Sequence, residues 1–98
     1  MTGQTPLSKE EIEAALENLS GWRFENDRLV KRFSFSSFRE AMSFMVRLSF
    51  EAETLDHHPE LTNVYNRVDV VLTTHDAGNQ VTASDIALAQ SIEHFSWI

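Results

Sequence analysis

The sequence contains no cysteine, and this absence removes several kinds of chemistry at once. A disulfide framework, a thiolate nucleophile and a cysteine-based zinc site are all excluded. Glycine occurs only at positions 3, 21 and 78, so the chain has no glycine-rich loop for phosphate groups. No serine lies in the glycine-flanked turn that exposes a hydrolase nucleophile. The remaining candidates for chemistry are histidines and carboxylates.

Positive charge is also scarce. The chain has 8 Lys and Arg against 15 Asp and Glu, a formal net charge of −7, and its basic residues form no cluster. Direct binding to nucleic acid or to an anionic membrane needs a basic face, so we expect neither. No apolar run approaches the roughly 20 residues of a membrane span. The first residues lack the features of a signal peptide, and we therefore expect a cytoplasmic protein.

The 98 residues predict a single domain, 1–98, and 42% apolar content is that of an ordinary globular core. Capping residues and apolar periodicity predict a helix between Ser8 and Gly21, a hairpin of strands 22–25 and 29–35 around Asn26-Asp27, and a helix over about 38–55. Two strands, 61–64 and 68–75, and a helix opening at Thr82 follow. This order predicts an α+β fold, with a four-stranded antiparallel sheet and three helices packed on one face.

The helix predicted over 38–55 has a narrow polar face and a wide apolar arc. Such an arc indicates burial on more than one side, which favours a central core helix over a direct subunit contact. Glu53 falls outside the polar face and near the helix C-terminus, where the macrodipole disfavours a carboxylate by roughly 0.3–1 kcal/mol. It is therefore either a snorkelling acid or a functional one. Pro59 restricts His58 to an extended backbone, which ends the helix at about Asp56 or His57.

Three of the four histidines, His57, His58 and His75, converge if the 61–75 hairpin folds back onto the end of this helix. Histidine titrates near neutral pH, so two of them beside one substrate can serve as acid and base. Taken singly, each also has a structural explanation at a helix end, a turn or a strand end, and Asp85 fits the third position of a capping box. A zinc site is the alternative for the set. We rank it lower because adjacent histidines on extended backbone point apart.

The spacing Glu53-x₃-His57-His58-Pro59-x₅-Tyr65-x₉-His75-x₉-Asp85 resembles the signature of the pterin-4a-carbinolamine dehydratases. The flanking segments 55–60, 63–66 and 72–75 and the Gly21-Trp22 pair are similar as well. The resemblance extends from about Leu7 to about Phe95. It implies an enzyme that dehydrates 4a-hydroxytetrahydropterins to quinonoid dihydropterins and thereby recycles the cofactor of aromatic amino-acid hydroxylases. No metal and no organic cofactor is implied.

The resemblance also implies roles for individual residues. His57 and His75 would be the acid–base pair, in an order that the sequence leaves open, with His58 positioning the substrate and Glu53 contacting or orienting a group. The further residues implied at the pterin site are Trp22, Asp56, Thr73, Thr74 and Asp76, while Pro59, Tyr65 and Asp85 complete the motif, Asp85 as a helix cap.

The family resemblance implies a homodimer or a homotetramer. Animal members of the family also act as dimerisation cofactors of a homeodomain transcription factor. A non-catalytic dimerisation or coactivator-type binding module is therefore the second hypothesis, and loss of the histidines would not affect its binding. The intact set of Glu53, His57, His58 and His75 favours the enzyme.

Overall fold

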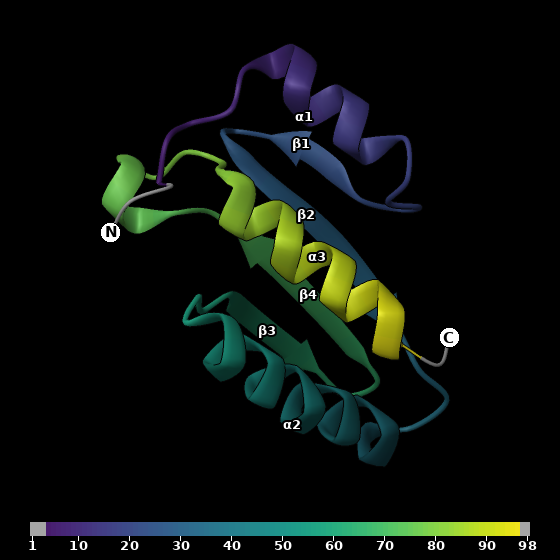
Figure 1. Cartoon of the computed structure of the whole chain (residues 1–98). Coiled ribbons are helices and arrows are strands. Elements are labelled where there is room, and N and C mark those ends of the chain that lie inside the picture. The colour runs from purple at the N-terminus through teal and green to yellow at the C-terminus, as the bar shows by residue number, and fades with distance from the viewer. Residues whose placement is uncertain (1–3, 97–98) are drawn as a thin grey trace.

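The computed structural model describes residues 4–96 of the chain. Three helices and four strands follow one another in the predicted order (Figure 1). They are α1 (Lys9–Leu16), β1 (Arg23–Glu25), β2 (Arg28–Ser34), α2 (Phe38–Leu55), β3 (Glu60–Val64), β4 (Arg67–Leu72) and α3 (Ala83–Phe95), with a short 3-10 helix, η1 (His75–Ala77), before α3.

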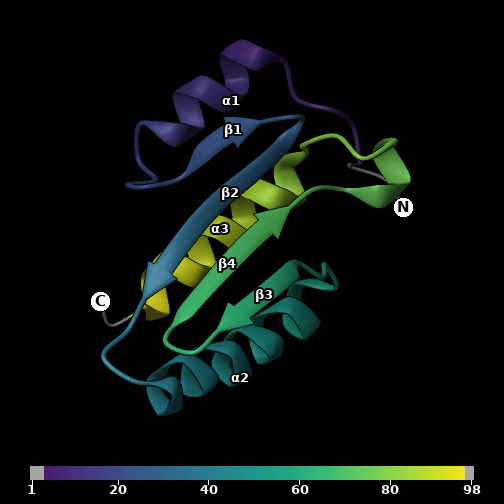
Figure 2. The same cartoon turned by 180° about the vertical axis from the view of Figure 1, so that it is seen from behind.

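The four strands form one antiparallel sheet in the order β1-β2-β4-β3. In Figure 1, α3 crosses in front of the central strands β2 and β4, and in Figure 2 it lies behind them. Helices α1 and α2 run beside the two outer strands, β1 and β3, in both views. Within residues 4–96 the opposite face of the sheet carries no helix, and the predicted α+β architecture is confirmed.

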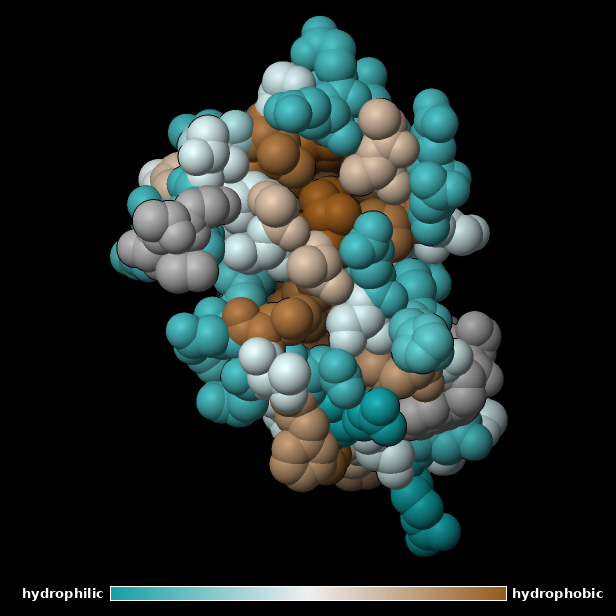
Figure 3. Space-filling model, viewed as in Figure 1, coloured by the Kyte–Doolittle hydropathy of each residue, from teal (hydrophilic) through white to brown (hydrophobic). Residues whose placement is uncertain are grey.

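The core lies between the sheet and the helices. Alternate residues of a strand point to the same face, so Leu29 and Phe33 of β2 meet Val68 and Leu72 of β4 in the register of the ladder. Figure 3 shows apolar surface between α1 and α3 and again between α3 and α2, where the helices flank this layer. Fully buried members of the core include Leu29, Phe33, Phe44, Leu48, Val68, Val70, Leu72, Leu88 and Ile92.

Lys31 interrupts the apolar face of β2, and the structure supplies partners for its charge. Its Nζ lies 2.6 Å from Glu93 Oε2 and donates to the carbonyl of Ser20 at 2.7 Å. Trp22 Nε1 donates to the same oxygen of Glu93 at 2.9 Å. This cluster ties the end of α3 to the first hairpin.

The turns use left-handed residues other than glycine. Asn26 and Asp27 have φ of 53° and 60° between β1 and β2, as predicted for a hairpin turn without glycine. Asp56 has φ of 51° and caps α2, which ends where Pro59 predicted it would. This reversal turns the chain from α2 toward β3, and His57 lies directly after it.

The prediction that α2 is a central core helix is wrong for the single chain. Its buried residues, Ala41, Phe44, Leu48 and Ala52, form one stripe at helical spacing. Other apolar residues of α2 face outward, and Phe50 is 65% exposed. The reason is the position of α2 beside the outer strand β3, where only one side of the helix meets the core.

The predicted strand 68–75 is too long. β4 ends at Leu72, and His75 begins η1 instead. Thr74 forms an isolated bridge with Gln80, and its carbonyl accepts from Ala77 and Asn79, so the backbone bends into a turn here. Trp97 and Ile98, the apolar end of the sequence, lie outside the described residues. Within residues 4–96, no helix combines the length and apolar character needed to cross a bilayer.

The uneven burial of α2 can be measured with two leucines of the same helix. Leu48 is fully buried and Leu55 is 40% exposed. Leu48→Ala should lower the free energy of unfolding by about 2–5 kcal/mol, because it removes apolar contact and leaves a cavity. Leu55→Ala should cost less than about 1 kcal/mol. Urea denaturation of both variants checks the difference, and equal losses would contradict it.

Candidate active site

A cleft of about 220 Å³ lies where the end of α2, the end of β4 and η1 meet. The three histidines predicted to converge do share it, so this prediction is confirmed. The cleft is lined by Asp56, His57, His58, Thr73, His75 and Asp76. Two segments about 15 residues apart in the chain therefore supply all of its side chains.

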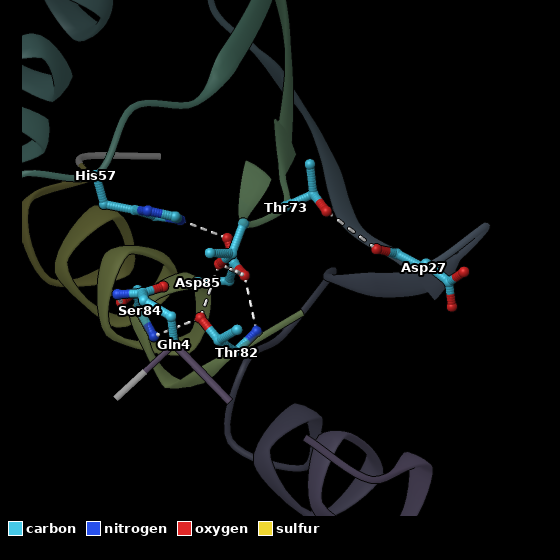
Figure 4. A network of polar contacts seen from close by, with 8 residues as sticks. Gln4, Asp27, His57, Thr73, Thr82, Ser84 and Asp85 are labelled. Carbon is cyan, nitrogen blue, oxygen red and sulfur yellow. Dashed lines mark hydrogen bonds and ion pairs between the residues drawn. The ribbon is translucent and has the colours of Figure 1, made fainter. Parts of the chain in front are cut away.

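His57 is the most firmly held of the three imidazoles. Its backbone N–H donates to the carbonyl of Ala52 at 3.0 Å, which fixes the residue against the last turn of α2. Its side chain is only 11% exposed, and Nε2 lies 2.5 Å from Oδ1 of the fully buried Asp85 (Figure 4). The Nε2 side of the imidazole therefore faces the protein interior.

Asp85 is fully buried, and both of its carboxylate oxygens have hydrogen-bond partners. Its Oδ2 accepts from the Thr82 backbone N–H at 2.9 Å (Figure 4) and from the Thr74 hydroxyl at 2.7 Å. The Thr74 and Thr82 hydroxyls are themselves 2.7 Å apart. Asp85 is the third residue of α3, where the helix dipole favours a negative charge. The predicted capping box with Thr82 is confirmed.

Sequence reasoning missed the second role of this carboxylate. A capping box alone explains Asp85 and gives no hint that the same group reaches His57 across 28 residues. The resemblance implies Thr74 at the pterin site, partly through backbone groups; in the structure the residue is 3% exposed and its hydroxyl faces Asp85. The only available signal was the alternation along β4, which puts Thr74 on the same inward face as Leu72.

His58 lies on the open side of the cleft. Its side chain is 61% exposed, and its Nε2 is 3.3 Å from Oε2 of Glu53, which is itself 69% exposed. Glu53 is thus an exposed acid at the end of α2, and it contacts an imidazole of the cleft. An exposed pair of this kind contributes little to stability. His57 and His58 thus contact different carboxylates, Asp85 and Glu53.

His75 forms the opposite wall and is held loosely. The residue is exposed, and its Nδ1 lies 3.4 Å from Asn79 Oδ1, at the long end of hydrogen bonding. Asp76 follows it in η1. Thr73 donates to the carbonyl of Asp27 at 3.3 Å, which links this wall to the β1–β2 turn (Figure 4).

Trp22 is not among the residues that line the cleft, in contrast to the expectation. It is 5% exposed, packs edge-on against Phe33 and donates to Glu93. Glu93 lies eight residues after Asp85 on α3, a separation of about 12 Å along the helix. Trp22 therefore belongs to the core around the far end of α3. The Trp22 side chain points inward because its indole packs in the apolar core against Phe33.

The remaining motif residues shape the backbone around the cleft. Pro59 stands between His58 and β3, and Tyr65 occupies the β3–β4 turn with φ of 53° and 65% exposure. Within residues 4–96, no group of three His, Asp or Glu side chains is arranged to hold a metal ion.

Residues 5–95 match the family model described as Pterin 4 alpha carbinolamine dehydratase. A protein of Opitutus terrae is 56% identical over 96% of this chain and 97% of its own length. One of Mesorhizobium japonicum is 50% identical over 91% and 92%, respectively. Both relatives are named provisionally as pterin-4-alpha-carbinolamine dehydratase.

Solved structures agree with the sequence relatives. A Brucella melitensis protein described as a transcriptional coactivator/pterin dehydratase superposes with a TM-score of 0.87 at 40% identity, covering 92% of this chain and 97% of that one. A pterin dehydratase-like protein described as a RuBisCO assembly factor of the alpha-carboxysome shares the fold, with a TM-score of 0.64 at 23% identity over 76% of this chain and 87% of its own. The chain belongs to the pterin-4-alpha-carbinolamine dehydratase family.

Proposed function

We propose that this protein dehydrates a 4a-hydroxytetrahydropterin to the quinonoid dihydropterin and water, with His57 and His75 as the acid–base pair. The observation that carries the proposal is the single cleft between these two imidazoles. Its volume of about 220 Å³ is below the roughly 300–1,000 Å³ of sites for drug-sized ligands, which suits a small bicyclic ring. The family membership supports the same reaction.

The reaction requires two proton transfers. One proton goes to the 4a-hydroxyl oxygen, and the C4a–O bond breaks as water leaves. A second proton leaves N5, whose electron pair forms the C4a=N5 double bond. A protonated imidazole can give the first and a neutral imidazole can take the second. Two histidines on opposite walls of one cleft support this division of labour, and the scheme needs no metal or organic cofactor.

The other cleft residues have positioning roles in this proposal. His58, beside Glu53, and the polar rim formed by Asp56, Thr73 and Asp76 would hydrogen-bond the pterin ring. The product is a pterin that a reductase can return to the tetrahydro form, so we assign the protein to cofactor recycling for aromatic amino-acid hydroxylases in the cytoplasm.

We also propose self-association, as a homodimer or a homotetramer, through the outer face of α2. A shallow apolar groove of about 750 Å³ runs along this face. Phe38, Met42, Val46 and Phe50 on it are 40–65% exposed. A contiguous apolar patch of this kind on a small domain is typical of an interaction surface. The groove is lined by Phe38, Arg39, Met42, Ser43, Val46, Arg47 and Phe50.

The same face offers a second candidate function, a binding module that docks another protein. The Brucella relative is described as both a coactivator and a dehydratase, and this description supports the second candidate function. Substitution of the cleft histidines distinguishes the two functions, because dehydration requires these histidines and binding through α2 does not.

His75→Ala and His57→Ala should each reduce the dehydration rate by at least about 10²-fold, since each removes one proton-transfer group. Their effects on stability should differ. His75 is exposed, so its loss should leave the free energy of unfolding nearly unchanged. His57→Ala leaves the buried Asp85 without one donor and should cost about 1–3 kcal/mol. Absorbance assays of carbinolamine breakdown and urea denaturation measure the two effects.

The control for this experiment is His94→Ala, which removes an exposed histidine of α3 outside the cleft. It should retain the wild-type rate. Wild-type dehydration by a well-folded His57/His75 double variant would refute the catalytic proposal. A folded wild-type protein that accelerates no dehydration but binds a protein through α2 would support the binding module.

Val46→Glu should shift the protein toward the monomer, because it places a charge in the centre of the apolar groove. Ala14→Glu, on an exposed position of α1, is the matched control and should leave the oligomeric state unchanged. Light scattering coupled to gel filtration gives the mass of each. A wild-type protein that is monomeric at high concentration would contradict the self-association proposal.

A further inference from the structure

Asp85 reaches the cleft only through His57, so its effect on the proposed reaction would be indirect. Three donors surround its two oxygens, namely the Thr74 hydroxyl, the Thr82 backbone N–H and His57 Nε2. The backbone N–H can only donate, and the Thr74 hydroxyl gives its single proton to the carboxylate. The Thr82 hydroxyl must then donate to Thr74 Oγ1, while it accepts from the Ser84 N–H at 3.2 Å. The direction of every hydrogen bond in this network is therefore determined.

This network favours an ionised Asp85. A carboxylate that accepts several hydrogen bonds has its charge satisfied, and the N-terminus of α3 adds the positive end of a helix dipole. An ionised carboxylate is an acceptor only. His57 Nε2 must consequently carry a hydrogen, both in the neutral imidazole and in the imidazolium.

The other ring nitrogen of His57 has a different environment. Nδ1 has no hydrogen-bond partner within residues 4–96 and is not among the buried unpaired atoms of that range. It is therefore the nitrogen that solvent in the cleft can reach. The other titratable side chains lining the cleft, Asp56, His58, His75 and Asp76, form no hydrogen bond with the His57 ring.

We infer that Asp85, oriented by Thr74 and Thr82, is a positioning residue that fixes His57 in the Nε2–H form, so that Nδ1 is the atom that exchanges a proton with the substrate. The role of Nδ1 in proton exchange with a substrate rests on the proposed dehydratase function. The tautomer of His57 is a property of the protein alone. A hydrogen-bonded carboxylate fixes the tautomer of a histidine base in the same way in the Ser-His-Asp triad.

Asp85→Asn provides a directed test. In the variant the amide oxygen must take the place of Oδ2, because only an oxygen can accept from both Thr82 N–H and the Thr74 hydroxyl. The amide NH₂ then faces His57 Nε2 and makes it an acceptor. His57 should switch to the Nδ1–H form, and the capping box should survive.

The measurement is two-bond ¹H–¹⁵N correlation NMR on protein labelled at histidine, with His57 identified by its absence from the His57→Ala spectrum. The wild-type neutral ring should show a single Nε2–H pattern, and Asp85→Asn a single Nδ1–H pattern. His58, His75 and His94 are internal controls that should not change. An Nδ1–H or averaged pattern in the wild type would overturn the inference, as would an unchanged pattern in folded Asp85→Asn.

Activity provides a second measurement with a matched control. Asp85→Asn should lower kcat by about 10²- to 10⁴-fold with little effect on KM. Glu11→Gln makes the same charge loss in the capping box of α1, where Glu11 accepts from the Ser8 N–H at 2.8 Å, and should leave kcat unchanged. Wild-type kcat in Asp85→Asn with a switched tautomer would overturn Nδ1 as the exchanging atom. A tautomer switch in a protein that shows no dehydration would refute the proposed function and leave the tautomer assignment standing.

Discussion

The buried carboxylate of Asp85 is the interaction on which the arrangement of the cleft depends. It is the first-turn acceptor of α3, the partner of the inward Thr74 after β4, and the anchor of His57 after α2. Three elements that contribute to the site are thus joined through one side chain. A buried charge is tolerated only when its hydrogen-bonding capacity is filled, which couples the geometry of the cleft to the integrity of the fold. Within residues 4–96, His75 has no comparable anchor, so the two imidazoles of the proposed pair differ in how firmly they are held as well as in exposure.

Much of the fold could be predicted from the sequence because its local signals agree with one another. The Ser8/Glu11 and Thr82/Asp85 capping boxes, the Asn26-Asp27 turn and the stop before Pro59 each depend on a few adjacent residues, and each is present in the structure. The convergence of the histidines was also predictable, because a hairpin that folds back onto a helix end brings its C-terminal end near that helix. The capping, turn and helix-stop signals each lie between residues that are close together in the sequence.

The errors concern burial and long-range contacts. Periodicity shows that α2 is apolar over a wide arc but cannot show which part of the arc meets the sheet, so the exposure of Phe50 and Val46 was missed. The inward direction of Trp22 and Thr74 depends on their partners, Glu93 and Asp85, which lie 71 and 11 residues away. A sequence motif identifies such residues but does not show whether their side chains point into the core or into the cleft.

The left-handed residue at the end of α2 has a consequence for engineering. Helices commonly place glycine in this conformation, whereas this chain uses Asp56, with φ of 51°, at a helix end that also disfavours an acid. Selection for heat resistance would therefore favour glycine at this position, with a gain of order 1 kcal/mol. The same exchange would remove a carboxylate from the cleft wall. Under the proposed function, thermostability and pterin binding would thus make opposite demands on Asp56.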